Sequence, residues 1–228
     1  MARGAKPKQE LPPPLPPERR TVGQLVAESI RLYGRCFLRA LPLGIFVAVI
    51  NQLTVGVARP AVTGVLLVTA PVFATGYAYA ARLMTEEGAP RRSWFVAVGA
   101  GSVIFVPAAL FFPWFALASV FWLALVGLAV PAAIVEGSSF MDSLRRGLAL
   151  GRVDYVHAAG SLATLVILFF LTRFGLGLLL ESQADNTVRT AVFLADTVLA
   201  PLLFLGAALL YVDQEARLRS RQERRPKE

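Results

Sequence analysis

The sequence predicts an all-α integral membrane protein, a polytopic bundle of about six transmembrane helices with two basic amphipathic helices at the membrane surface. Hydrophobic residues make up 56% of its 228 residues and charged residues only 17%, which is too apolar a composition for a soluble domain. The apolar residues form long blocks that are apolar on every side, as a lipid environment requires. Lysines and arginines gather in alternate connections between these blocks, which places both termini on one side of the membrane.

Residues 1–20 are rich in proline and charge and contain no apolar run. Such a segment cannot bury a core, so we expect a disordered tail with polyproline II character. A cleaved signal peptide needs an apolar stretch near the N-terminus, and none is present before residue 36. We therefore expect the first span to act as an uncleaved insertion signal. Cys36 is the only cysteine, which excludes an intrachain disulfide.

Residues 21–39 have the pattern of a basic amphipathic helix. Thr21 and Gln24 have the spacing of a capping box at its start. Such a helix is suited to an anionic membrane surface, where its arginines reach the phosphate headgroups. The predicted apolar stripe contains Val22, Val26, Ile30, Tyr33 and Phe37, and the predicted headgroup contacts are Arg31, Arg35 and Arg39.

Six apolar stretches follow, each close to the ~20 residues that cross a ~30 Å hydrocarbon layer. The 43 uncharged residues between Arg92 and Glu136 would form a helix of roughly 65 Å. Because that is about twice a bilayer, the segment must turn back once, and we expect the turn at Pro113, within a cluster of aromatic residues. The predicted spans are residues 40–57, 61–81, 94–110, 114–135, 155–180 and 190–212, followed by a basic tail at residues 213–228.

A second short amphipathic helix is predicted over residues 139–151, between the fourth and fifth spans. Ser139 and Asp142 have capping spacing at its start, and apolar residues recur along one side. Arg152 follows directly and is a further expected contact with lipid headgroups.

The distribution of lysines and arginines orients the predicted bundle. Twenty of the 23 basic residues fall in the termini and the connections on their side, whereas only Arg59 and Arg189 fall on the other side. Positive residues are retained in the cytoplasm, so both termini should be cytoplasmic. Arginine outnumbers lysine by 20 to 3, a bias typical of GC-rich bacterial genomes, and the expected location is the bacterial inner membrane.

Two charges inside the predicted spans are the main functional candidates, because a charge in lipid costs about 2.5–3.5 kcal/mol on insertion scales. Arg173 and Asp196 lie at a matching depth of roughly 10 Å in consecutive antiparallel spans. They could form an ion pair that fixes helix packing, line an ion or substrate path, or not meet. Asn51 in the first span is expected to make an interhelical hydrogen bond.

Glu136 ends the fourth span, where it could pair with Arg145 or Arg82 or simply stop the helix. No catalytic motif, metal site or cofactor is predicted. His157 is the only histidine, so no multi-histidine metal site can form, and no nucleophile turn or phosphate-binding loop is present. Membrane insertion explains the basic residues, so we expect no nucleic acid partner.

The segment VPAAIVEGSSFMDSLRRGLALGRVDYVHAAGSL, residues 130–162, carries a sparse pattern of polar and small residues between two spans. Its members are Pro131, Glu136, Gly137, Ser143, Arg145, Arg146 and Gly151. In this pattern the chain resembles the membrane domain of bacterial glycerophosphoryl diester phosphodiesterases and related integral membrane proteins. The likeness extends over residues 21–218 through the opening TVGQLVAESIRLYGRCFLRALPL and the closing APLLFLGAALLYVDQEARLR. In fused members the hydrolase is a separate TIM barrel, and we expect none in this chain.

The resemblance implies a non-catalytic membrane module, a scaffold or auxiliary in envelope or lipid metabolism. Its expected partners are anionic phospholipids and a separate phosphodiesterase or other envelope protein; the oligomeric state stays open. The alternative is a component of a small-solute or lipid transporter or channel, with Arg173, Asp196 and Asn51 lining a polar path. A sealed bundle whose polar groups pair internally would favour the module, and a water-accessible cavity reaching Asp196 would favour transport.

Overall fold

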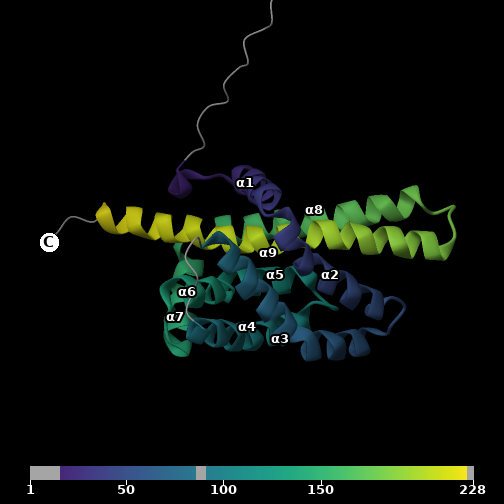
Figure 1. Ribbon diagram of the computed structural model, residues 1–228. Helices are drawn as coiled ribbons and strands as arrows, with labels where there is room; N and C mark the ends of the chain where they lie inside the picture. Colours follow the sequence, from purple (N-terminus) through teal and green to yellow (C-terminus); the bar gives the residue numbers. More distant parts are fainter. Residues whose placement is uncertain (1–15, 86–90, 225–228) are drawn as a thin grey trace, which may run out of the picture.

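The computed structural model describes residues 16–85 and 91–224, and all regular structure in these residues is helical. Six of the helical segments are long and apolar enough to cross a membrane, so the predicted all-α, multi-pass membrane fold is confirmed. The elements in Figure 1 are a 3-10 turn at Pro17–Arg19, α1 (Val22–Arg35), α2 (Phe37–Thr54), α3 (Arg59–Met84), α4 (Arg91–Phe111), α5 (Ala116–Val126), α6 (Ala129–Glu136), α7 (Phe140–Val153), α8 (Tyr155–Leu179) and α9 (Asp185–Glu223).

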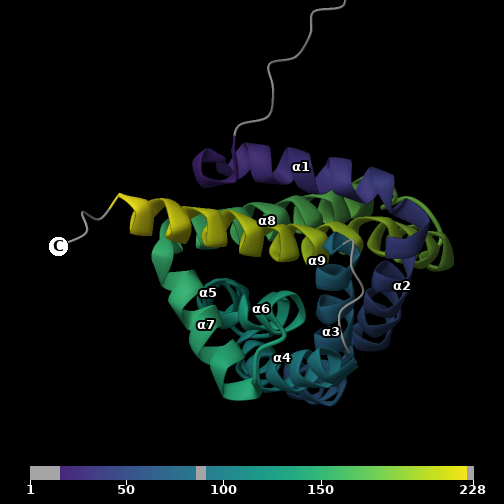
Figure 2. The same ribbon diagram turned by 60° about the vertical axis from the view of Figure 1, so that its left-hand side comes forward.

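The 39-residue helix α9 is the axis on which the bundle is built. Its length is about 58 Å, nearly twice a hydrocarbon layer. Helix α8 runs beside it, and the α8–α9 hairpin reaches past the other helices in Figure 1. Figure 2 shows α1 lying over α9 and α8, while α2 and α3 also contact α9. Helix α9 continues to Glu223, so the predicted basic tail is helical over residues 213–223.

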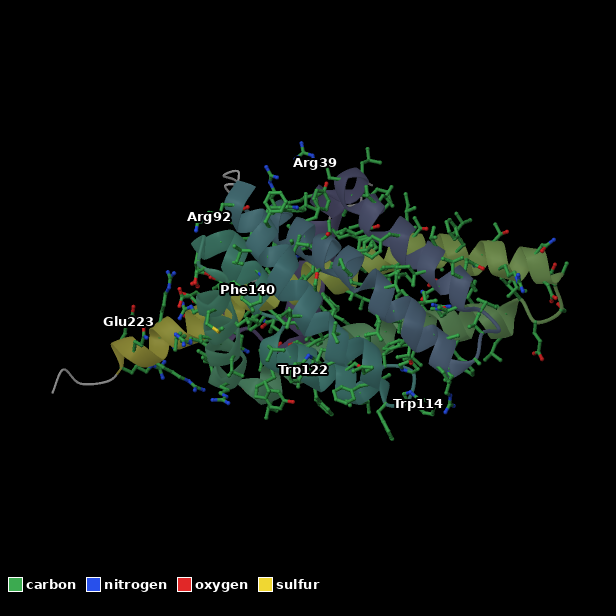
Figure 3. All side chains as sticks on the ribbon, turned by 90° about the horizontal axis from the view of Figure 1, so that it is seen from below. Arg39, Arg92, Trp114, Trp122, Phe140 and Glu223 are labelled. Carbon is green, nitrogen blue, oxygen red and sulfur yellow. The ribbon has the colours of Figure 1, made fainter. Side chains whose placement is uncertain are left out.

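The two ends of the bundle differ in charge. We call the end where Arg39 and Arg92 lie the basic end, and the end where Trp114 lies the opposite end (Figure 3). At the basic end the Tyr79 hydroxyl donates to the Arg39 carbonyl at 3.0 Å, joining the start of α2 to the last turns of α3. At the opposite end the Arg59 guanidinium lies 5.7 Å from the centre of the Trp114 ring.

The predicted helix over residues 21–39 is two helices, divided at Cys36, whose backbone (φ −118°, ψ 25°) leaves the helical region. The predicted capping box is confirmed: the Gln24 amide donates to the Thr21 hydroxyl at 3.4 Å, and the Gln24 side chain accepts from the Thr21 amide at 2.9 Å. The predicted apolar stripe is only partly right. Ile30 is 50% exposed. The face that packs on α8 and α9 contains the residues one position before Val26 and Ile30. Its fully buried members are Leu25 and Ser29, followed by Tyr33.

The fourth span is interrupted between α5 and α6. Pro131 lacks the amide hydrogen that would reach the carbonyl of Gly127, and its ring crowds that carbonyl. The Val130 amide instead bonds Gly127 at 3.2 Å in a tighter turn. Helix α7 packs onto this break through its glycines. A Cβ at Gly147 would overlap the backbone of Ala129, and one at Gly151 would overlap the carbonyl of Leu125.

Helix α7 is the second predicted amphipathic helix, and it runs across the basic end, steeply inclined to α9 (Figure 2). Its predicted cap is confirmed, since the Asp142 amide donates to the Ser139 hydroxyl at 3.4 Å. The predicted turn near Pro113 is also confirmed: α4 ends at Phe111 and α5 begins at Ala116.

Candidate functional site

The two charges predicted inside the membrane meet in the structure. Arg173 Nη1 of α8 lies 3.2 Å from Asp196 Oδ2 of α9, and the Asn51 amide of α2 donates to the same oxygen at 3.0 Å. Asp196 is fully buried, and the Arg173 guanidinium also lies 5.7 Å from the centre of the Phe169 ring. The cluster therefore ties three spans together, and the possibility that Arg173 and Asp196 do not meet is wrong.

Apolar side chains close this cluster off from the basic end. Leu165 and Phe169 occupy the α8 surface between Arg173 and the basic end, with 3% and 7% exposure. Asp196 Oδ1 has no hydrogen-bond partner among the described residues. The carboxylate thus directs one oxygen at two donors on neighbouring helices, an arrangement suited to holding helices together.

Helix α7 is held at the basic end by a cluster of four polar side chains. Arg146 Nε donates to Glu136 Oε1 at 2.8 Å, and Arg146 Nη2 forms a short ion pair with Glu215 of α9. The Tyr211 hydroxyl also donates to Glu136 Oε1 at 2.8 Å. Burial alone would lower the pKa of Arg146, but the two carboxylates outweigh it and raise that pKa above its usual value. The expected pairing of Glu136 with Arg145 or Arg82 is wrong, because α7 turns Arg146 inward and leaves Arg145 exposed.

A second polar cluster joins the start of α1 to α8 and α9. Arg20 Nη1 lies 2.7 Å from Asp213 Oδ1, and Arg217 donates to Asp154 Oδ2 and to the Arg20 carbonyl, both at 2.6 Å. His157 Nε2 is 3.8 Å from Asp213 Oδ2. The expectation that residues 1–20 bury nothing is therefore wrong at Arg20; residues 1–15 lie outside the described residues.

Sequence reasoning missed this second cluster entirely. Asp213 is fully buried although it follows an apolar stretch directly and reads as the start of a solvated tail. A usable signal was present, since α9 keeps helical periodicity beyond residue 212 without a proline or glycine. Its burial depends on α1 folding back over it, which no local pattern shows.

The arginines predicted to meet lipid headgroups fall into two groups. Arg31 and Arg35 contact Glu28 at 3.3 and 3.6 Å on the exposed side of α1. Arg39 and Arg152 are exposed, and no carboxylate of the described residues lies within 4.0 Å of either. Arg39 and Arg152 are thus the more available for phosphate.

The remaining predicted positions have local structural roles. Gly137 ends α6 with φ +64°, a left-handed conformation that glycine adopts without strain. Ser143 is buried, and its hydroxyl donates to the Ser139 carbonyl at 2.7 Å. Gly151 provides the close approach of α7 to α5.

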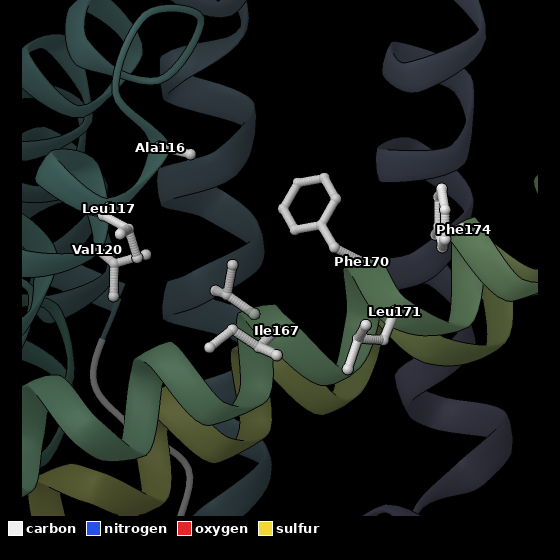
Figure 4. Close-up of a pocket in the computed structure, with 8 residues that line it drawn as sticks. Ala116, Leu117, Val120, Ile167, Phe170, Leu171 and Phe174 are labelled. Atoms are coloured by element: carbon white, nitrogen blue, oxygen red, sulfur yellow. The ribbon is translucent and has the colours of Figure 1, made fainter.

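Two apolar grooves open on the outside of the spans. One of about 280 Å³ lies between α5 and α8, where Leu117 and Val120 face Ile167 and Phe170 (Figure 4). The other, of about 480 Å³, lies between α2 and α3. Neither groove includes Asp196 in its lining.

Comparison with protein-family profiles, curated proteins and solved structures finds no match to this chain. The resemblance to the phosphodiesterase membrane domain therefore stays a prediction. Within residues 16–85 and 91–224, no three His, Cys, Asp or Glu side chains come together as a metal site would require.

Proposed function

We propose that this chain is a non-catalytic integral membrane module that serves as a scaffold or auxiliary in envelope or lipid metabolism. In this proposal it resides in a bacterial inner membrane with both termini in the cytoplasm. It contacts anionic phospholipids and works beside a phosphodiesterase or other envelope protein.

The burial of the intramembrane carboxylate carries the proposal. Asp196 is fully buried and accepts from Asn51 while contacting Arg173. A transport path would have to expose this carboxylate to water, since a substrate or ion must reach the group that selects it. A carboxylate that binds three helices together suits a rigid scaffold better.

The distribution of exposed charge supports a membrane-surface role at the basic end. Arg39, Arg145 and Arg152 are exposed there on α2 and α7. Each basic side chain near an anionic leaflet contributes about 1 kcal/mol of attraction. This end would therefore sit against the cytoplasmic leaflet, which also agrees with retention of positive residues in the cytoplasm.

Recovery of partners from native membranes tests the proposal. The tagged chain is crosslinked in bacterial membranes, purified in mild detergent and submitted to protein and lipid mass spectrometry. We expect a phosphodiesterase or another envelope enzyme to be enriched over a matched purification of an unrelated six-span protein. Equal recovery from both purifications would contradict the auxiliary role.

A transport assay addresses the competing function, a small-solute or lipid transporter component. Proteoliposomes of the purified chain should show no solute uptake above empty vesicles, because Asp196 is sealed. Uptake that Asp196→Asn abolishes and Arg189→Gln leaves intact would assign a transport path to the cluster instead.

A further inference from the structure

The groove between α2 and α3 has the properties of a site for a hydrocarbon chain. Its walls run from Pro42 to Leu53 on α2 and include Thr69 and Val72 of α3. Leu53 is 62% exposed and Val72 43%, so the groove opens outward along the span. The single hydroxyl among its lining side chains is already used, since Thr69 donates to the Val65 carbonyl at 2.7 Å.

The groove also matches an acyl chain in length and shape. Pro42 and Leu53 are eleven residues apart, or about 16 Å along the helix, and half of a hydrocarbon layer is about 15 Å. Phe46 lines the groove, and its ring lies 5.6 Å from that of Phe73 in an edge-on contact. This aromatic contact packs Phe46 of α2 against α3 at the wall of the groove.

Arginines lie at the basic end of the groove. Arg39 is one helical turn before Pro42 and is exposed; Figure 3 shows it extending away from the helices. Tyr79 holds the Arg39 carbonyl, and Arg82 follows one turn later, in the last turn of α3. Both residues are exposed and lie at the end of their helices where a phosphate would be if its chain occupied the groove.

From this juxtaposition we infer that α2 and α3 form a specific binding site for one anionic phospholipid. An acyl chain lies in the groove from Pro42 towards Leu53, and the phosphate contacts Arg39 and Arg82. The inference rests on the proposed function only for the membrane orientation of the basic end, and it needs no protein partner.

The second groove provides an internal comparison. It lies between the first turns of α5 and the second half of α8, towards the opposite end, and it is equally apolar. Arg173 lies beside it in sequence but is engaged with Asp196, and Arg59 covers Trp114. This groove can accept a chain, but within the described part of the chain Arg59 and Arg173 are already in contact with Trp114 and Asp196.

Native mass spectrometry of the purified full chain tests the site, with phosphatidylglycerol and phosphatidylcholine titrated separately. We expect one tightly bound phosphatidylglycerol. Its apparent Kd should rise about fivefold in Arg39→Gln and about 25-fold when Arg82→Gln is added, on the basis of the usual contribution of one basic residue. Phosphatidylcholine should be weakened much less by both changes, because its choline cation offsets the phosphate charge that the arginines attract. Arg59→Gln should leave both lipids unchanged.

Filling the groove separates chain binding from headgroup binding. Val49→Trp places an indole in the α2–α3 groove and should weaken both lipids, whereas Val166→Trp in the other groove should not. Soluble glycerol phosphate should fail to compete, because it has no chain.

Equal loss in Arg39→Gln and Arg59→Gln would overturn the site, as would undiminished binding in Val49→Trp or displacement by glycerol phosphate. Because Arg39 is exposed, Arg39→Gln should not disturb the core. The comparison of Arg39→Gln with Arg59→Gln therefore tests the site even if a tryptophan variant fails to fold. Because the titration contains no protein partner, its outcome is independent of whether a phosphodiesterase is recovered.

Discussion

At the scale of single residues, the Arg173–Asp196 contact is the main charged interaction between the spans described here. The pair is within hydrogen-bonding distance at 3.2 Å, and Asp196 has no exposure to solvent. Removing one member of a buried pair leaves an uncompensated charge, which commonly costs about 3–5 kcal/mol, whereas apolar replacement of both can be nearly neutral.

We therefore expect Arg173→Leu and Asp196→Leu each to lower the free energy of unfolding by about 3 kcal/mol. The double variant should lose less than the sum of the two, with a coupling energy of about 1–3 kcal/mol. Unfolding of the detergent-solubilised single and double variants by heat or denaturant measures these free energies. Arg189→Leu, at an exposed arginine of α9, is the control. Additive losses would show that the contact contributes no net stability.

The Arg173–Asp196 contact could be predicted from the sequence. The depth of a residue in the membrane follows from its position along the span and the helical rise per residue. The pairing of Glu136 with Arg146 could not be predicted, because the choice among neighbouring arginines depends on the rotation of α7 about its axis. That rotation is set by Gly147 and Gly151 against the α5–α6 break, a contact between segments that no periodicity reveals.

At the scale of elements, the seating of α7 on the interrupted span should be sensitive to a single methyl group. Gly151→Ala would place its Cβ against the Leu125 carbonyl, a backbone atom that cannot move aside. We expect destabilisation of about 1–3 kcal/mol, the usual cost of overpacking. Gly175→Ala is the matched control, since nothing lies within 4 Å of its added carbon.

The same thermal unfolding assay measures both glycine variants. Alanine at position 175 should be neutral or slightly stabilising, because alanine is the better helix former. If both variants unfold at the same temperature as the parent protein, α7 is not seated through Gly151. Pro131, which causes the break, is evident in the sequence. That α7 packs on this break could not be predicted, because it depends on how distant segments come together in the fold.

The docking of α1 depends on a buried carboxylate at the far end of α9. Asp213 accepts from Arg20 at 2.7 Å and is fully buried. Asp213→Asn removes the charge and should loosen the start of α1, so we expect its amides to exchange hydrogen about tenfold faster, the loss of one charge-assisted bond. Asp185→Asn, exposed at the opposite end, should leave this exchange unchanged.

Unaltered exchange in Asp213→Asn would show that α1 is held by its apolar contacts and the Arg217–Arg20 hydrogen bond without the Asp213 charge. Leu25 is fully buried and is the main such contact. The distinction matters because sequence patterning identified α1 as amphipathic but placed its apolar face one residue away. Helical periodicity alone could not separate Leu25 from Val26, since both are apolar and only the position of α9 selects between them.

At the scale of the whole molecule, the asymmetry of charge predicts a single orientation in the membrane. The predicted topology assigns twenty of the 23 lysines and arginines to the side of the termini and two to the other side. Bringing the larger set across an apolar layer would be far costlier than bringing Arg59 and Arg189 across. The chain should therefore insert with the basic end inward in every copy.

Cysteine labelling in intact bacterial cells measures this orientation. In a Cys36→Ser background, Ser182→Cys lies in the turn between α8 and α9, and Gln222→Cys lies near the end of α9; both positions are exposed. A membrane-impermeant maleimide should label position 182 in intact cells and position 222 only after permeabilisation, because of these two positions only 182, in the α8–α9 turn, faces outward. The reverse pattern would place the exposed arginines on the outer leaflet and remove the basis for the lipid site, whereas labelling of both positions in intact cells would mean that the charge asymmetry does not fix one orientation.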